Sequence, residues 1–314
     1  MPTATVICTC YNHEKFVVEA ILSVLDQSYE NIQLIVIDDA STDNSVIAIE
    51  GIITDKDFRF IKNKKNQGLC KNFNNALKYA QGKYVIDLSA DDVLFNNRIE
   101  TQVEFFELLS EDYGVVFSNA ELINEDDGFQ KHFYKIGRDK LALEKPNVGN
   151  VYTDLIGKFF IAAPTMMMRK SMLDELGGYD ETLAYEDFDF WIRSSRNWKY
   201  AFQDKVLTKI RETSGSLSST QYLAGDEQLA TTYEVCRKIY DLNESKAENE
   251  ALIGRLKYEI KHAVMAEKRD DAQNFLTLLK KLEPTSKTAK FFDQLNRLNL
   301  PTSWLRNSLQ KIRT

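Results

Sequence analysis

Three pairs of adjacent acidic residues stand out, because each lies beside an element that the sequence predicts. Asp38-Asp39 and Asp91-Asp92 follow apolar runs, and Glu186-Asp187 opens a helical pattern. Neighbouring carboxylates repel each other unless a positive group offsets their charge. Mg²⁺-like ions meet this need, since they bind one or two carboxylates together with phosphate oxygens of a substrate. The pair at 91–92 therefore predicts a cation held against phosphate, and the alternative is a polar turn in which Asp92 begins the next helix.

The first two pairs follow runs of residues that favour buried strands. Helical patterns separate these runs, and alternating strands and helices form a largely parallel sheet. Ligands of such sheets bind beyond the carboxyl ends of the strands. We therefore expect Asp38-Asp39, Asp91-Asp92 and the turn Tyr11-Asn12 at one edge of the sheet. The strand-like runs are residues 4–9, 32–37, 58–61, 84–88 and 114–118, followed later in the chain by 163–168, 199–202 and 206–211.

Glycine motifs that cradle phosphates are missing from the chain. The turn after the first predicted strand has no glycine, so there is no G-x-G-x-x-G, and no G-x-x-x-x-G-K-[ST] occurs. A nucleotide would therefore be held through carboxylates and a metal ion.

The third acidic pair begins a helix that the core would anchor. Phe188, Trp191 and Ile192 share one helical face, so Glu186 and Asp187 should project from the first turn. The helix dipole should stabilise the carboxylate there, which keeps it usable as a base. The alternative is an acidic helix start with no further role.

The remainder of the chain offers interaction surfaces and helices. Residues 121–150 are polar and irregular, which fits either a substrate-facing loop or a plain surface excursion. After a junction at 214–219, four helices are predicted. A last helix at 301–314 is either interfacial, in contact with a membrane, or docked on its own domain. The four helices are expected at 222–243, 246–266, 270–282 and 286–298.

Composition limits the class of protein. The chain has 314 residues, 43% hydrophobic, which is enough for a large α/β domain with an appendage. Its net charge of −7 argues against a general nucleic-acid binder. The four cysteines form no zinc pattern, so we expect buried, reduced thiols. With no secretory signal or spanning segment in the sequence, a cytoplasmic protein is expected, with peripheral membrane contact through the last helix.

The motifs, taken in order, resemble those of the family 2 glycosyltransferases, which are inverting enzymes of the GT-A fold. The resemblance covers about residues 1–220 and implies a domain with the GT-A fold at 1–218, while the helical patterns predict a separate helical region at 219–314. The GT-A domain has a Rossmann-like, mostly parallel sheet flanked by helices. The matching elements are Tyr11-Asn12, the D-D-x-S-x-D run at 38–43, Gly68 with Lys71-Asn72, the D-x-D region at 89–92, the G-G-[FY]-D-E element at 177–181 and Glu186-Asp187.

The resemblance also implies a role for each matching residue. Asp187, with Glu186 beside it, would be the catalytic base, and Asp91 and Asp92 would bind Mn²⁺ or Mg²⁺. The nucleotide sugar would contact Thr9, Tyr11, Asn12, Asp38, Asp39, Ser41, Lys71, Ser89, Ala90 and Asp91.

Two positions depart from the family pattern. Ser89 replaces the first acid of D-x-D, so a hydroxyl stands on the ribose side. Thr213 stands where many members place a histidine, in an R-x-H-x-x-S context. Ligation of the metal then rests on Asp91 and Asp92.

The predicted activity is a hexosyltransferase that uses a nucleoside diphosphate sugar, with UDP favoured. Its acceptor would be a hydroxyl of a glycan, glycolipid or glycoprotein in cell-surface polysaccharide or glycoconjugate synthesis. One rival is a sugar-nucleotide pyrophosphorylase, which normally needs a glycine-rich basic loop that residues 9–15 do not supply. Another is a binding protein of the same fold without transferase activity, for which Ser89 and Thr213 are the hints.

Overall fold

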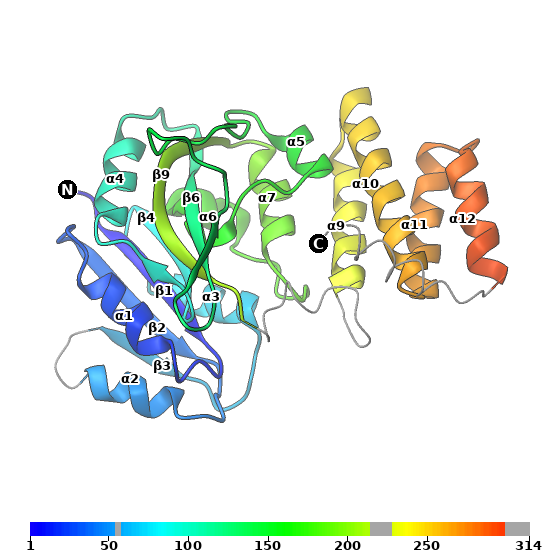
Figure 1. Ribbon diagram of the computed structural model, residues 1–314. Helices are drawn as coiled ribbons and strands as arrows, with labels where there is room; N and C mark the ends of the chain where they lie inside the picture. Colours follow the sequence, from blue (N-terminus) through cyan, green and yellow to red (C-terminus); the bar gives the residue numbers. More distant parts are fainter. Residues whose placement is uncertain (54–57, 214–227, 299–314) are drawn as a thin grey trace. The chain divides into compact units, whose positions relative to one another are not determined.

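Residues 1–53, 58–213 and 228–298 are described by a computed structural model of the chain (Figure 1). They divide into two compact units. The first contains residues 1–151 and 160–213, and the second joins residues 152–159 to the C-terminal helices. The predicted domain boundary at 218/219 and the predicted helix at 301–314 lie outside the described residues.

The first unit begins with strands and helices in alternation, as the sequence predicts. Strand β1 pairs in parallel with β2 and with β4, and β2 pairs in parallel with β3. In this register Cys10 lies opposite Asp38, and Thr9 lies opposite Ser89. The carboxyl ends of β1, β2 and β4 therefore meet at one edge of the sheet. The elements are β1 (Ala4–Cys10), α1 (Val17–Leu25), β2 (Ile32–Asp38), α2 (Ser45–Ile53), β3 (Arg59–Lys62), α3 (Leu69–Leu77) and β4 (Tyr84–Ser89).

The rest of the first unit extends this sheet with mixed pairing. In the described residues nine strands form one sheet, in the order β3-β2-β1-β4-β8-β6-β9-β5, with β7 paired to β6. Strand β8 is antiparallel to β4 and β6, whereas β9 is parallel to β6. The added elements are β5 (Val93–Leu94), α4 (Arg98–Glu107), β6 (Tyr113–Ile123), β7 (Phe129–His132), the 3₁₀ helix η1 (Ala163–Thr165), β8 (Met167–Arg169), α6 (Lys170–Leu176), α7 (Asp187–Ser195) and β9 (Lys199–Arg211).

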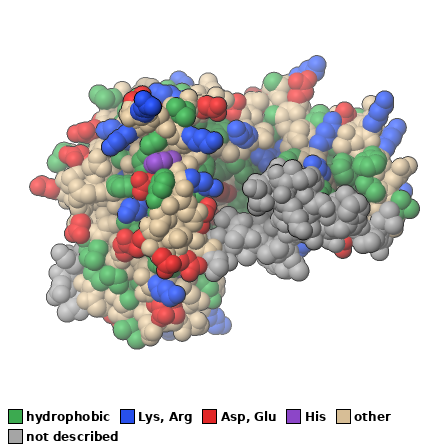
Figure 2. All heavy atoms as spheres, in the orientation of Figure 1, with side chains coloured by type: hydrophobic (Ala, Val, Ile, Leu, Met, Phe, Trp, Pro, Cys, Tyr) green, Lys and Arg blue, Asp and Glu red, His purple; other side chains and the backbone are tan. Residues whose placement is uncertain are grey.

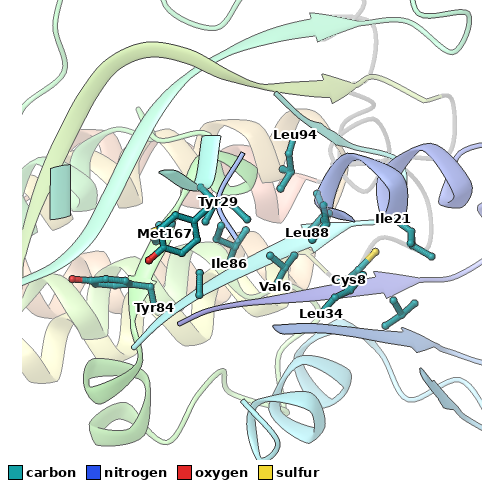
Figure 3. Close-up of a cluster of buried hydrophobic side chains, with 14 of the residues drawn as sticks. Val6, Cys8, Ile21, Tyr29, Leu34, Tyr84, Ile86, Leu88, Leu94 and Met167 are labelled. Carbon is teal, nitrogen blue, oxygen red and sulfur yellow. The ribbon is translucent and has the colours of Figure 1, made fainter. Parts of the chain in front are cut away.

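The central strands are covered on both faces. Every residue of β1 is buried, which agrees with its continuous run of apolar and small side chains. One face packs against α1, α2 and α4, and Val6, Cys8 and Leu88 belong to the same buried cluster there as Ile21 of α1 (Figure 3). The four cysteines are buried free thiols. This core fixes the sheet edge that carries the predicted site.

The described part of the second unit consists of helices. Its four C-terminal helices lie close to the predicted ranges, and Ser245 and Glu248 form a capping box at the start of α10. Arg255 donates from Nε to the carbonyl of Ile156 at 2.9 Å and pairs with Glu259 at 3.2 Å, which ties α5 to α10. Within the described residues, every helix is too short or too polar to cross a lipid bilayer. The helices are α5 (Tyr152–Gly157), α9 (Gln228–Leu242), α10 (Lys246–Met265), α11 (Arg269–Leu282) and α12 (Lys287–Leu298).

Candidate active site

The Tyr11-Asn12 turn is fastened to the loop that follows β2. The backbone N–H of Asn12 donates to Ser41 Oγ at 2.9 Å, and Asn12 Oδ1 accepts the N–H of Thr42 at 2.8 Å. Asn12 takes a left-handed φ of 58°, which asparagine tolerates better than most residues. The Tyr11 side chain is 46% exposed. The turn therefore presents the Tyr11 ring to solvent close to the carboxyl end of β2.

Asp39 organises the turn before α3. Its Oδ1 accepts from Asn63 Nδ2 at 2.9 Å and from the N–H of Gln67 at 2.8 Å, and its Oδ2 accepts the N–H of Gly68 at 2.9 Å. Gly68 has a φ of +85°, which side chains with a Cβ rarely adopt. Three donated hydrogen bonds keep this buried carboxylate satisfied while it shapes the backbone between β3 and α3.

Asp38 and Thr9 lie deeper at the same edge. Asp38 Oδ1 accepts the N–H of Ser41 at 3.0 Å, and its Oδ2 finds no hydrogen-bond partner in the part of the chain that the structure describes. The carbonyl of Thr9 accepts the N–H of Ala90 at 3.0 Å. Both side chains are buried, so Thr9 and Ala90 shape the edge chiefly through their backbones.

Asp91 and Asp92 have different partners. Ser89 donates from Oγ to Asp91 Oδ1 at 2.5 Å, and His13 Nε2 lies 3.8 Å from Asp91 Oδ2. Asp92 Oδ1 instead accepts the backbone N–H of Arg211 at 2.9 Å. Burial raises the pKa of Asp92 well above its usual range, and repulsion from Asp91 raises it further. Asp92 therefore fastens the end of β9, while Asp91 shares the edge with a hydroxyl and an imidazole.

Arg211 was not among the predicted site residues. Its Nε donates to the carbonyl of Asp91 at 3.0 Å, and its guanidinium pairs with Glu19 at 2.9 Å and with Asp127 at 2.6 Å. The Arg211 side chain is almost fully buried. Arg211 thus fixes the backbone at Asp91. Because the two residues are more than a hundred positions apart, the sequence alone gives no sign of this contact.

The donor set at this edge suits a divalent ion that arrives with a phosphate ligand. A carboxylate from Asp91 and the Ser89 hydroxyl are hard oxygen donors of the kind that Mg²⁺ and Mn²⁺ prefer. Within the described residues, no cluster of three or more His, Cys, Asp and Glu side chains could hold a metal ion. The chain alone supplies few ligands, and phosphate oxygens would have to complete the coordination.

Glu186 and Asp187 stand at the start of α7, both half-buried. Asp187 Oδ1 accepts the N–H of Phe188 at 2.6 Å. Burial nevertheless raises the pKa of Asp187 to about 6, and burial together with the charges of Asp187 and Asp87 raises the pKa of Glu186 well above its usual range. Our expectation of a dipole-stabilised carboxylate was wrong in direction, because desolvation outweighs the helix terminus. A carboxyl with a pKa near 6 is still mostly ionised at pH 7, so it can serve as a base.

Asp87 is a further acid that sequence reasoning missed. It lies on β4, and Tyr179 donates from its hydroxyl to Asp87 Oδ2 at 3.1 Å. Burial raises the pKa of Asp87 to about 7, although the Tyr179 hydrogen bond lowers it. Asp87 also raises the pKa of Glu186 through charge repulsion, which links β4 to the start of α7. The one sequence feature that could have indicated Asp87 is that it is the single acidic residue in the otherwise mostly apolar strand β4.

Helix α3 connects the Asp39 region to the loop before α7. Asn72 Oδ1 accepts from Asn63 Nδ2, the group that also binds Asp39, at 2.6 Å. Asn74, two residues further along the same helix, holds Tyr179, because its Nδ2 donates to the Tyr179 carbonyl at 2.8 Å and its Oδ1 accepts the Tyr179 N–H at 2.9 Å. Phe73 stacks on the Tyr179 ring with centroids 4.2 Å apart. Lys71 is exposed on this helix, next to Asn72.

The glycines of the G-G-Y-D-E element allow this close approach. Gly177 ends α6 with a φ of +71°, and Gly178 follows with a φ of +76°. A Cβ at Gly178 would lie 2.2 Å from Asn74 Oδ1, which is far below a normal contact. The loop that leads to Glu186 therefore packs on α3 because glycine occupies both positions.

We expect Asp87→Asn to stabilise the protein more at pH 8 than at pH 5. The folded-state pKa of about 7 lies above the model-peptide value of 3.8. Between these values the folded protein holds a proton that the unfolded chain has lost, so the wild-type free energy of unfolding falls as pH rises through this range. Asparagine has no such penalty. Melting temperatures of both proteins at the two pH values measure the effect.

The control for this prediction is Asp126→Asn, which removes an exposed carboxylate from the same unit. It should give the same small change in melting temperature at pH 5 and pH 8. An Asp87→Asn difference that does not depend on pH would contradict the burial of an ionisable group at this position.

A surface groove of about 540 Å³ lies beside α1 and β5. It contains none of the predicted site residues, although Glu19, which pairs with Arg211, is part of its wall. The acidic edge and this groove are thus neighbouring but separate features. The lining residues are Lys15, Val18, Glu19, Leu22, Ser23, Asp26, Val93, Leu94 and Asn96.

Comparisons with known proteins agree with the motifs at this edge. The family model described as "Glycosyl transferase family 2" matches residues 5–177. A relative named "Putative glycosyltransferase EpsE" from Bacillus subtilis is 30% identical over 244 residues, which is 76% of this chain and 83% of that protein.

Solved structures with a similar fold include two nucleotide-sugar complexes. S. aureus TarS residues 1–349 in complex with UDP-GlcNAc has a TM-score of 0.70 at 18% identity, covering 98% of this chain and 92% of that one. The mannosyltransferase PcManGT from Pyrobaculum calidifontis, in complex with GDP-Man and Mn²⁺, has a TM-score of 0.60 at 14% identity, with 96% and 86% covered. At such low identity these two structures establish the fold alone, and it is the predicted one, GT-A.

Proposed function

The chain belongs to glycosyl transferase family 2 and is a transferase, and we propose that it moves a sugar from a nucleoside diphosphate sugar to an acceptor hydroxyl with inversion at the anomeric carbon. The observation that carries the proposal is the half-buried Asp187, whose pKa of about 6 suits a base. Helix α3 connects the loop before Asp187 to the turn that Asp39 holds, through Asn74 on one side and Asn72 on the other.

The donor proposed is a UDP-sugar. The exposed Tyr11 ring offers a stacking surface for a base, and the backbone shaped by Asp39 and Asn12 borders it. Ser41 and Lys71 stand at the same edge as polar contacts for the ribose and phosphates. The UDP-GlcNAc complex of TarS supports this choice, while the GDP-Man complex of PcManGT shows that the fold also accepts another base.

Asp91, assisted by Ser89, is proposed to hold a Mn²⁺ or Mg²⁺ ion. When bound, such an ion offsets the negative charge that develops on a diphosphate leaving group. Asp92 was predicted as a second ligand, but its Oδ1 already accepts from Arg211, so we assign it the positioning of β9. Arg211 in turn holds the Asp91 backbone in place.

Asp187 is proposed to take the proton of the acceptor hydroxyl. As that oxygen forms its bond to the anomeric carbon, the bond to the leaving diphosphate oxygen breaks on the opposite face, which inverts the configuration. The proton moves to the Asp187 carboxylate, and the pair of electrons leaves with the diphosphate. Burial and the charges of Asp187 and Asp87 raise the pKa of Glu186, which disfavours a second negative charge beside the base.

The acceptor class follows the family expectation. We propose a glycan, glycolipid or glycoprotein precursor, made in the cytoplasm for a cell-surface polysaccharide or glycoconjugate. The long excursion at residues 124–150 borders the edge, since Asp127 in its first turn pairs with Arg211. It is the segment most suited to choose between acceptors.

A panel of sugar nucleotides tests the proposed donor. Each compound is incubated with the full-length protein, with and without Mn²⁺, and release of the nucleoside diphosphate is measured. We expect one UDP-sugar to be hydrolysed fastest, and EDTA to reduce the rate to background. Equal rates for all bases, or hydrolysis that ignores EDTA, would contradict the UDP or the metal assignment respectively. Absence of nucleotide binding to any compound would contradict the transferase proposal as a whole.

A further inference from the structure

One face of the excursion after β6 exposes aromatic, aliphatic and basic side chains together. We call it the outer face and define it by five residues, which are Lys131, Phe133, Lys135, Leu141 and Leu143. Its apolar members are exposed, with Phe133 at 39% and Leu143 at 66%. Figure 2 shows basic and hydrophobic side chains interspersed on the visible surface of this unit.

Backbone pairing places these residues on one side. From residue 131 to 136, the exposed residues 131, 133 and 135 alternate with half-buried ones, as in a strand with one face covered. An antiparallel bridge joins Ile136 to Ala142, and the N–H of Leu143 donates to the carbonyl of Lys135 at 2.8 Å. Lys135 therefore lies opposite Leu143, and both share the side that bears the exposed residues.

The framework beneath the outer face is fixed by its own hydrogen bonds. Asn119 Nδ2 donates to the carbonyl of Tyr134 at 2.8 Å, and Asn119 Oδ1 accepts the Tyr134 N–H at 2.8 Å. The Tyr134 ring packs on Phe202 with centroids 5.2 Å apart. The N–H of Ala142 donates to Asp204 Oδ1 at 2.9 Å. The exposed side chains are thus presented by an ordered backbone, so a partner need not fold this segment.

The segment is basic in an acidic protein. Residues 129–148 contain five Lys or Arg and two Asp or Glu, a balance of +3, whereas the chain as a whole carries −7. Lys145 pairs with Asp204 at 3.1 Å. Among the described residues, the other four basic side chains form no ion pair, and they are Lys131, Lys135, Arg138 and Lys140. Their charge is available to an external anion.

We propose that the outer face binds the surface of a membrane that contains anionic lipids. Exposed Phe and Leu side chains enter the boundary between headgroups and acyl chains, and neighbouring Lys and Arg side chains attract the negative lipid surface. A soluble acidic partner would use the charges but would leave three large apolar side chains in water, so the combination favours a lipid surface.

This surface continues into the candidate active site. Asp127, in the turn just before β7, pairs with Arg211 at 2.6 Å, and Arg211 holds the Asp91 carbonyl at 3.0 Å. Binding through the outer face would therefore bring the catalytic edge close to the lipid surface. That consequence rests on the proposed function and implies a lipid-carried acceptor, whereas membrane binding itself does not depend on activity.

Co-sedimentation with vesicles tests the proposal. The full-length protein is mixed with phosphatidylcholine vesicles that contain or lack phosphatidylglycerol. A charge variant, Lys131→Gln with Lys135→Gln, and an apolar variant, Phe133→Ser with Leu143→Ser, are compared with wild type. Each basic residue near the lipid surface is worth about a fivefold change in affinity, so the charge variant should bind about 25-fold more weakly. The apolar variant should also bind more weakly, and salt should weaken wild-type binding.

A matched control uses exposed residues elsewhere in the same unit. Lys64→Gln with Lys65→Gln removes the same charge, and Ile47→Ser removes an exposed aliphatic side chain. These variants should bind anionic vesicles as wild type does. Circular dichroism checks that every variant is folded.

Three results would overturn the proposal. They are wild-type protein that does not pellet with anionic vesicles, outer-face and control variants that lose binding equally, and wild-type protein that binds soluble polygalacturonate but no vesicle. The last result would assign the face to an acidic polymer. None of them bears on donor hydrolysis, so the proposed function is tested separately.

Discussion

The Asp187→Asn variant is expected to lose about 10³-fold in kcat for sugar transfer while its affinity for the UDP-sugar stays within about twofold of wild type. General bases contribute about 10²- to 10⁴-fold, and an amide cannot accept the proton of the acceptor hydroxyl. The substitution keeps the size of the side chain, and an amide oxygen can still accept the Phe188 N–H that Asp187 Oδ1 accepts at 2.6 Å. Transfer kinetics and calorimetry with UDP measure the two quantities.

The pH dependence of transfer checks the same assignment. A base with a pKa of about 6 loses its proton-accepting form below that pH, so kcat/KM should fall about tenfold per pH unit there. Burial raises the pKa of Asp187, whereas the repulsion between the two acids raises that of Glu186, so Glu186→Gln should leave the decline at the same pH. Asp174→Asn, an exposed change on α6, should leave rate and profile unchanged. Normal turnover in Asp187→Asn would remove Asp187 from the mechanism.

Replacement of Asp91 by Asn should abolish Mn²⁺-dependent binding of UDP and lower kcat/KM by about 10³-fold or more. Asp91 is the acid at the end of β4 whose partners are a hydroxyl and an imidazole, so its carboxylate is the one suited to an incoming ion. An amide is a much weaker ligand for Mn²⁺, so the diphosphate would keep its charge as it leaves. Calorimetry with UDP, with and without Mn²⁺, separates metal-dependent affinity from the rest.

The Asp92→Asn variant is the matched comparison for Asp91. In the wild type, the Asp92 carboxylate accepts the Arg211 N–H, and burial raises the pKa of Asp92. A neutral amide should therefore be tolerated at this position. We expect Asp92→Asn to retain the Mn²⁺-dependent increment in UDP affinity. If both variants lose that increment equally, the two acids ligate together as the sequence predicted, and the positioning role of Asp92 is wrong.

The parallel half of the fold could be predicted because its signals are local. Runs such as residues 34–37 are buried on both faces, so their apolar content alone predicts a strand. The other half depends on tertiary pairing. The segments 199–202 and 206–211 were predicted as two strands but form β9 alone, since register shifts against β6 absorb the polar residues between them. The predicted strand at 163–168 is a 3₁₀ helix that contains Pro164, followed by the short strand β8.

The candidate site shows the same division. The acids at 38–39, 91–92 and 186–187 follow from motifs and from the direction of the strands. The contacts that distinguish Asp91 from Asp92 involve Arg211, which is distant in the chain, and the clamp that Asn74 places on Tyr179 is equally non-local. The raised pKa of Asp187 also depends on tertiary burial, which a helix-terminus argument does not contain.

The claim on which the account depends is that the cation and the nucleotide bind together at the Asp91 edge. Electron paramagnetic resonance of Mn²⁺ tests this directly, since the signal of free Mn²⁺ disappears on binding. With no cluster of three ligating side chains in the described residues, the protein should bind Mn²⁺ weakly alone and tightly when UDP is added, and Asp91→Asn should remove the increase beyond that given by UDP in buffer. Tight Mn²⁺ binding without nucleotide, or an increase that survives Asp91→Asn, would contradict the account.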